Sequence, residues 1–126
     1  MRIAFTDREL DVMAVLWAQG PSTAAEVRER LTDDLAYNTV LSMLRILEDK
    51  GYVGHTEEGR AHRYFPRVAR EAAGTSALAR LTEKIFGGSA ELLLTHLVRD
   101  RSLDEAELKR LRRLLDERIR KGEGRK

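Results

Sequence analysis

The chain has 126 residues, of which 42% are apolar and 35% are charged, and its formal net charge is +2. It contains no cysteine, which excludes disulfides, thiolate metal sites and a cysteine nucleophile. No apolar run approaches the length of a membrane span, and the N-terminus lacks the apolar core of a signal peptide. We therefore expect a cytoplasmic protein with no direct membrane insertion, built as one domain or as a small domain followed by an oligomerisation segment.

Three helices are expected in the first half of the chain. Thr6 and Glu9 have the spacing of a capping box, and the helix that they open should end near Gln19, before a Gly-Pro pair. A second capping box at Thr23 and Glu26 opens a short helix, and a third helix covers about 37–50. The apolar positions predicted for these helices are, in order, Leu10, Met13, Ala14 and Trp17; Val27 and Leu31; and Val40, Met43, Leu44 and Leu47.

A β-hairpin is expected directly after the third helix. Its strands cover about 52–57 and 61–65, with Glu58-Gly59 as the turn, and only a very short strand at Pro21-Ser22 is possible elsewhere. With that turn, His55 and His62 would lie opposite each other. A metal ion would need a further ligand and Glu57 is the only plausible one nearby, so we expect neither a metal site nor a cofactor.

The second half of the chain is expected to be all helical. A helix over about 69–86 ends at Gly87-Gly88, Ser89 caps a second helix, and a capping box beginning at Ser102 opens a third. These helices have too few large residues to bury three apolar faces within one chain. We expect them to pair with a second copy, the alternative being that they pack against the first half. The predicted dimerisation residues are Leu78, Leu81, Ile85, Leu93, Leu97, Leu108, Leu111 and Leu115.

Three helices followed by a basic hairpin outline a winged helix-turn-helix, a mainly α fold with a small β-hairpin. Asn38, Ser42, Arg45 and Asp49 fall on one face of the third helix, and Asn and Arg side chains can bind adenine and guanine edges bidentately. The alternative is a solvated helix face. The other residues expected to contact double-stranded DNA are Tyr37, Thr39 and Leu41 on the helix and Arg60, His62 and Arg63 in the hairpin. We accordingly divide the chain into a DNA-binding domain, 1–68, and a helical dimerisation region, 69–126.

Catalysis finds no support in the sequence. There is no nucleophile-elbow serine, glycine-rich phosphate loop or HExxH pattern, so we do not expect an enzyme. Two other classes stay open. The near-neutral first half permits a winged helix that binds proteins, and a pocket between the halves would make a ligand-responsive regulator. A steep loss of affinity with rising salt would favour DNA binding over the protein-binding class.

Several segments together resemble the penicillinase-repressor family of winged-helix regulators. Leu10, Met13, Leu16 and Trp17 stand where that family has its opening-helix pattern, and the run from Ala36 to Val40 resembles the start of its recognition helix. The most specific segment is Arg-Ala-His-Arg-Tyr-Phe-Pro at 60–66, which resembles the wing, and residues 102–115 resemble its last dimerisation helix.

The resemblance implies a homodimer that binds a palindromic operator and blocks transcription. It also implies a membrane sensor-protease as a partner, which cuts the repressor at an Asn-Phe bond in the dimerisation region. His96-Leu97 stands at that place here. Ile46 occupies a position where the family commonly has Arg, and Arg45 precedes it, which turns the guanidinium by about 100° around the helix. The metal-binding cysteines of a copper-responsive branch are absent.

Overall fold

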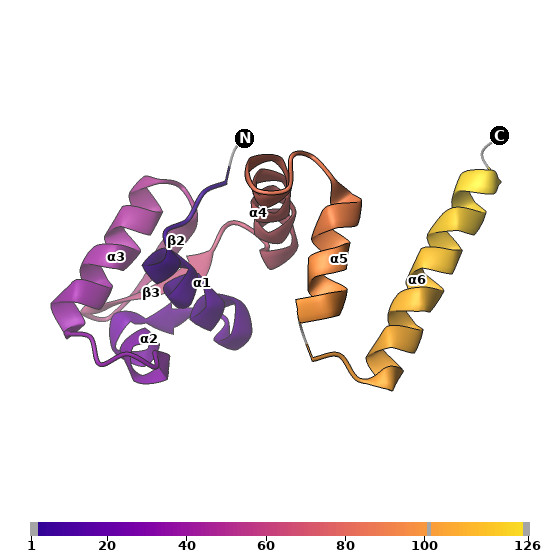
Figure 1. Ribbon diagram of the computed structural model, residues 1–126. Helices are drawn as coiled ribbons and strands as arrows, with labels where there is room; N and C mark the ends of the chain where they lie inside the picture. The colour runs from indigo at the N-terminus through magenta and orange to yellow at the C-terminus, as the bar shows by residue number, and fades with distance from the viewer. Residues whose placement is uncertain (1–2, 101, 125–126) are drawn as a thin grey trace. The chain divides into compact units, whose positions relative to one another are not determined.

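The computed structural model describes residues 3–100 and 102–124, which form six helices and one three-stranded sheet. The described chain divides into two compact units, one reaching Arg80 and the other beginning at Leu81. The elements, coloured along the chain in Figure 1, are α1 (Asp7–Gln19), β1 (Ser22–Thr23), α2 (Ala24–Arg30), α3 (Tyr37–Asp49), β2 (Val53–Glu58), β3 (Ala61–Pro66), α4 (Arg70–Lys84), α5 (Ala90–Asp100) and α6 (Glu105–Glu123).

The first two capping boxes form as predicted. The Thr6 hydroxyl accepts a hydrogen bond from the Glu9 backbone N–H at 3.1 Å, and the Glu9 carboxylate accepts one from the Thr6 N–H at 2.8 Å. Thr23 and Glu26 repeat this arrangement at the start of α2. Each box satisfies backbone donors that a helix start would otherwise leave without partners.

The hydrophobic core of the N-terminal unit lies between α1, α2, α3 and the sheet. Val40, Leu44 and Leu47 of α3 are fully buried, as predicted, and the predicted Met43 packs beside them. The other fully buried side chains are Val12, Met13, Leu16, Val27, Val53 and Tyr64, the last two within about 1% of complete burial.

The prediction for α1 was partly wrong. Leu10 is 39% exposed and Ala14 is exposed, whereas Val12 and Leu16 fill the core. Leu10 and Ala14 are four residues apart, as are Val12 and Leu16, so either spacing fits one face of a helix. The packing of α1 against α3 and the sheet buries Val12 and Leu16. Trp17 stays at the edge of this face, where its indole N–H donates a 2.8 Å hydrogen bond to the Val68 carbonyl.

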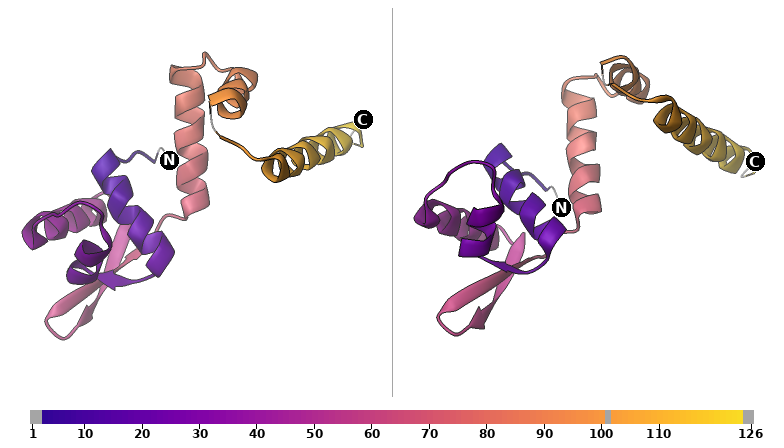
Figure 2. Two further views of the ribbon diagram at one scale, coloured as in Figure 1. Left: turned by 60° about the horizontal axis from the view of Figure 1, so that its bottom comes forward. Right: turned by 90° about the horizontal axis from the view of Figure 1, so that it is seen from below.

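The sheet is antiparallel with strand order β1-β3-β2. Pairing of Glu58 with Ala61 makes Gly59-Arg60 the two-residue turn, so the predicted turn at Glu58-Gly59 was one residue early. Gly59 has a φ of 62°, which glycine adopts without the steric cost of a Cβ. The short first strand is Ser22–Thr23, one residue later than predicted. The hairpin of β2 and β3 extends beyond the helices of its unit (Figure 2).

The helices after the sheet bury little. In α4, Ala73 is the one buried residue among those that the structure describes. Ser76 of the same helix donates a 3.0 Å hydrogen bond to the Ile3 carbonyl. Neither α5 nor α6 contains a buried residue within the described chain. Ser89 accepts from the Leu92 N–H, as its predicted capping role requires. The third capping prediction was wrong, because Asp104, not Ser102, caps α6 by accepting from the Glu107 N–H at 2.7 Å.

Candidate nucleic-acid interface

The α3 helix presents a polar face on the side opposite its buried residues. Asn38, Ser42, Arg45 and Asp49 are all exposed, so the predicted stripe exists as a surface. Thr39 is exposed beside it, Leu41 is half-buried, and Tyr37 at the start of the helix is 44% exposed. A buried stripe with an opposite polar stripe makes α3 amphipathic, as most surface helices are, and in helix-turn-helix proteins it is the polar stripe of the recognition helix that enters the major groove.

Three elements surround a hollow beside this helix. The start of α2, the exposed side of α3 and the tip of the hairpin all contribute side chains to it. The structure thereby brings together five of the residues predicted to contact DNA, namely Tyr37, Leu41, Arg45, Arg60 and His62. Asn38, Thr39 and Ser42 lie on the exposed surface of α3 without lining the hollow.

Sequence reasoning missed part of the lining of this hollow. Ala24 and Ala25 of α2 contribute to it, together with Thr23. Pairing of Thr23 with Arg63 in the sheet places the start of α2 next to the hairpin. The capping box was visible in the sequence, but a two-residue strand carries too little pattern to predict that pairing.

Tyr64 lies beneath this surface, and its side chain is 1% exposed. Burial raises the pKa of its hydroxyl, and the nearby Glu48 carboxylate raises that pKa further. The Arg45 guanidinium opposes both effects through its charge and a hydrogen bond. The hydroxyl therefore stays protonated at neutral pH, and the position of Arg45 on α3 is coupled to a fixed residue of the sheet.

The two arginines of the hairpin have different surroundings. Arg60 is exposed in the turn and makes no ion pair within the described chain. Arg63 donates to Glu58 at 2.5 Å, to Glu26 of α2 at 2.8 Å and to the Pro21 carbonyl at 3.2 Å. Arg60 is thus available for a phosphate contact, whereas a DNA contact by Arg63 requires it to leave its carboxylate partners.

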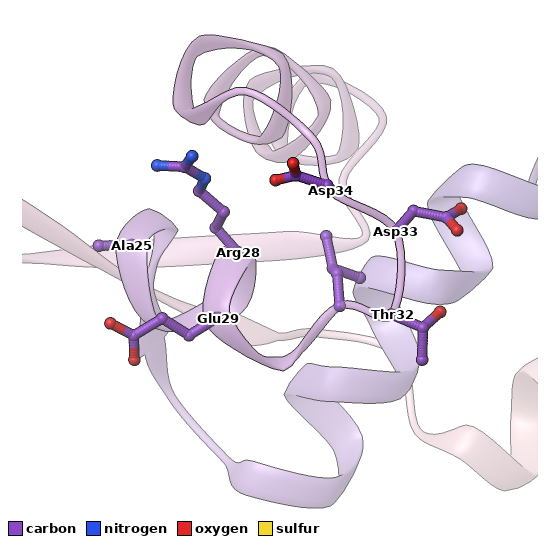
Figure 3. Close-up of a pocket in the computed structure, with 7 residues that line it drawn as sticks. Ala25, Arg28, Glu29, Thr32, Asp33 and Asp34 are labelled. Carbon is purple, nitrogen blue, oxygen red and sulfur yellow. The ribbon is translucent and has the colours of Figure 1, made fainter.

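Two side-chain contacts hold the connection between α2 and α3 in place. Figure 3 shows the open hollow at this turn, with Arg28 extending from α2 and Asp33 directed away toward α1. The Arg28 guanidinium donates a 2.9 Å hydrogen bond to the Leu35 carbonyl, and Asp33 forms an ion pair with Arg8 of α1. These contacts hold the turn that sets the direction of α3, so we assign this hollow a structural role.

The family of the chain follows from comparison with known proteins. The family model described as penicillinase repressor matches residues 5–117, which is most of the sequence. The chain belongs to the penicillinase repressor family. Members of this family are transcriptional repressors, not enzymes, and the chain is accordingly a winged-helix DNA-binding repressor.

Individual relatives agree with this assignment. The chain is 39% identical over 118 residues to the transcriptional regulator BlaI of Mycobacterium tuberculosis, with 88% of this chain and 82% of that protein covered. It is 25% identical over 114 residues to the penicillinase repressor of Bacillus licheniformis, covering 89% of each. Among solved structures, it is similar to the DNA-binding domain of the repressor BlaI, with 32% identity and a TM-score of 0.51 over 57% of this chain and 93% of that one.

That structural similarity confirms the predicted fold, a winged helix within a mainly helical chain. None of the described helices is both long and apolar enough to cross a membrane.

Proposed function

We propose that this repressor binds a palindromic operator as a homodimer, with α3 in the major groove and Arg60 of the hairpin against the phosphate backbone or in the minor groove. The observation that carries the DNA-binding half of this proposal is the hollow that brings Arg45 of α3 and Arg60 of the turn to one surface. In this proposal Asn38 and Arg45 contact base edges, Tyr37 and Ser42 contact phosphates, and the half-buried Leu41 and exposed Thr39 contact thymine methyl groups.

The operator is tested by selecting genomic fragments with the purified protein and footprinting the enriched sites at two salt concentrations. We expect a protected two-fold palindrome whose protection is lost at high salt, because phosphate contacts release counterions. Enrichment of no site, or binding that is indifferent to salt and sequence, would instead support the protein-binding class. Binding that depends on a small molecule in the selection buffer would support a ligand-responsive regulator.

The dimer is supported by exposed apolar side chains in the second unit. In the single chain α5 and α6 form an apolar groove between them. Large apolar side chains of these two helices nevertheless stay at least 40% exposed, namely Leu97, Leu108, Leu114, Leu115 and Ile119. Apolar surface of this extent is usually covered by a partner, and a second copy related by two-fold symmetry is the commonest one. We propose that the functional division lies at 68/69, so that all of α4 belongs to the dimerisation region, although its residues up to Arg80 belong to the first compact unit.

The dimer is tested by replacing Leu111 and Leu115 with Asp and measuring mass by sedimentation equilibrium. We expect monomers, because two carboxylates would have to be desolvated in the interface. Ile46→Asp is the matched control, since Ile46 is a 48% exposed apolar residue on α3, outside the proposed interface. A dimer that survives the double substitution, or one that is lost equally in the control, would contradict the proposal.

We extend the proposal to induction by cleavage in the dimerisation region. His96 and Leu97 are both exposed in the middle of α5, a helix with no buried residue in the described chain. Local unfolding of such a helix costs little, so its peptide bonds can enter a protease. The test is co-expression with a sensor-protease and its inducer, followed by mass spectrometry of the fragments. Cleavage outside residues 69–126, or none, would rule out this route.

A further inference from the structure

Three side chains with metal-binding atoms lie together on one face of the hairpin. His55 and Glu57 are two residues apart on β2, so they share a face, and Glu57 pairs directly with His62 of β3. Their ligand atoms all lie within 4.8 Å of one another. The rings of His55 and His62 stack in parallel with centroids 4.2 Å apart. With the turn at Gly59-Arg60, Glu57 lies directly opposite His62 and on the same face as His55, so three candidate ligands come together.

A fourth residue fixes one of these ligands. The Glu48 carboxylate of α3 lies 2.5 Å from Nδ1 of the half-buried His55. A carboxylate at this distance favours the tautomer with the proton on Nδ1, which leaves the Nε2 lone pair available. Histidines that bind metals characteristically donate their other ring N–H to a carboxylate or carbonyl in this way.

We propose that the hairpin binds one divalent transition-metal ion of the zinc class through His55, Glu57 and His62. Two imidazole nitrogens and one carboxylate oxygen form a ligand set that suits Zn²⁺, Co²⁺ and Ni²⁺ and leaves one position for water. Metal bonds of about 2.0–2.1 Å require ligand atoms roughly 3.4 Å apart in tetrahedral geometry. The site therefore closes by side-chain rotation, in which His62 and the exposed Glu57 turn toward Nε2 of His55 and the parallel ring stack opens.

The metal would act on the part of the chain that meets DNA. His62 lines the hollow beside α3, so a bound cation would add positive charge at this surface and hold the hairpin strands together. This consequence rests on the proposed DNA-binding role, whereas metal binding itself does not, and the two are measured separately.

The site is tested by titrating the full chain, free of any affinity tag, with ZnCl₂ in a calorimeter and with Co²⁺ in a spectrophotometer. We expect one ion per chain and the visible absorption of tetrahedral Co²⁺. His55→Gln and His62→Gln should each weaken Zn²⁺ binding at least tenfold. Glu48→Gln should weaken it by about tenfold, the lower end of the range for losing a carboxylate that orients a histidine ligand.

The third histidine of the chain supplies a matched control. His96 lies beside Asp100 on α5, a helix whose sequence contains no second histidine, so His96→Gln should bind Zn²⁺ like the parent chain. The proposal would be overturned if His96→Gln and His62→Gln lost Zn²⁺ affinity equally. Unchanged Zn²⁺ affinity in both His55→Gln and His62→Gln would also overturn it. The absence of saturable binding in the parent chain would also overturn it, even if DNA binding is intact. Thermal melts without metal confirm that each variant is folded.

Discussion

Arg63 of β3 and Glu26 of α2 form a 2.8 Å ion pair, and the same guanidinium binds Glu58 across the hairpin. The hydrogen bond between Arg63 and Glu58 raises the pKa of the Arg63 guanidinium and lowers the pKa of the Glu58 carboxyl. The pKa of Glu26 is lowered first by the Thr23 backbone N–H and then by Arg63. Arg63 thus joins the hairpin to the start of a helix, a role that its place in a basic sequence run does not reveal.

The first prediction separates the two hairpin arginines. Arg60→Ala should weaken binding to specific and random DNA alike and reduce the slope of log affinity against log salt by about one, as expected for a lost phosphate contact. Arg63→Ala should change that slope much less, because its guanidinium already has carboxylate partners. The measurement is fluorescence anisotropy of labelled DNA over a salt series. Equal slope changes in both variants would place Arg63 on the DNA as well.

The second prediction concerns the anchoring of the hairpin. Arg63→Ala should increase hydrogen exchange severalfold at amides of β1 and β3, since the substitution removes the bonds to Glu58, Glu26 and the Pro21 carbonyl. Arg60→Ala is the matched control, because Arg60 lies in the turn outside these contacts. Exchange that is unchanged in Arg63→Ala, or equally fast in both variants, would argue against an anchoring role.

The third prediction assigns base recognition to α3. Asn38→Ala and Arg45→Ala should each lower affinity for the operator by ~1–3 kcal/mol and leave binding to random DNA less affected, if each side chain makes a bidentate base contact. Asp49→Asn is a useful comparison, because it changes the same exposed face near the end of the helix without removing a predicted base contact. Equal losses on operator and random DNA would assign Asn38 and Arg45 to the backbone instead.

Local signals in the sequence were sufficient for two features of the N-terminal unit, the helix caps and the buried face of α3. The boxes at Thr6 and Thr23 depend on residues three apart, and the buried face of α3 depends on one unambiguous stripe, so both could be predicted. The hairpin turn was misplaced by one residue because Glu58-Gly59 and Gly59-Arg60 both put glycine in a two-residue loop. Only the pairing of the whole strands decides between them.

The candidate site shows the same division between local and long-range information. Exposure of Asn38, Ser42 and Arg45 follows from helix periodicity, and the structure confirms it. The partners of Arg63 lie 37 residues away in α2 and five residues away across the turn, so they depend on tertiary packing. The bond between Glu48 and His55 likewise joins a helix to a strand. Such contacts carry no periodic pattern that a single sequence displays.

The last prediction concerns a charge pair that joins the end of α3 to the first turn of α1. Lys50, just after α3, donates a 2.8 Å hydrogen bond to Glu9 of α1, whose carboxylate is almost fully buried. Lys50→Met should destabilise the chain by about 1–3 kcal/mol, because it leaves a buried carboxylate without its partner. Urea unfolding at neutral pH measures this change. Glu105→Gln is the control, since Glu105 and Lys109 form an exposed pair on α6 that should contribute little.

The same pair makes stability depend on acid pH. Burial raises the pKa of Glu9, but hydrogen bonds from Lys50 and Thr6, together with the Lys50 charge, lower it more, so its pKa in the folded chain lies below the ordinary value of 4.5. The stabilisation is therefore present above about pH 4.5 and is lost as the pH falls through the folded-state pKa. The difference in unfolding free energy between the parent chain and Glu9→Gln should be constant above pH 5 and shrink below it. A difference that is independent of pH, or one that grows in acid, would show that Glu9 is not held as a carboxylate by Lys50.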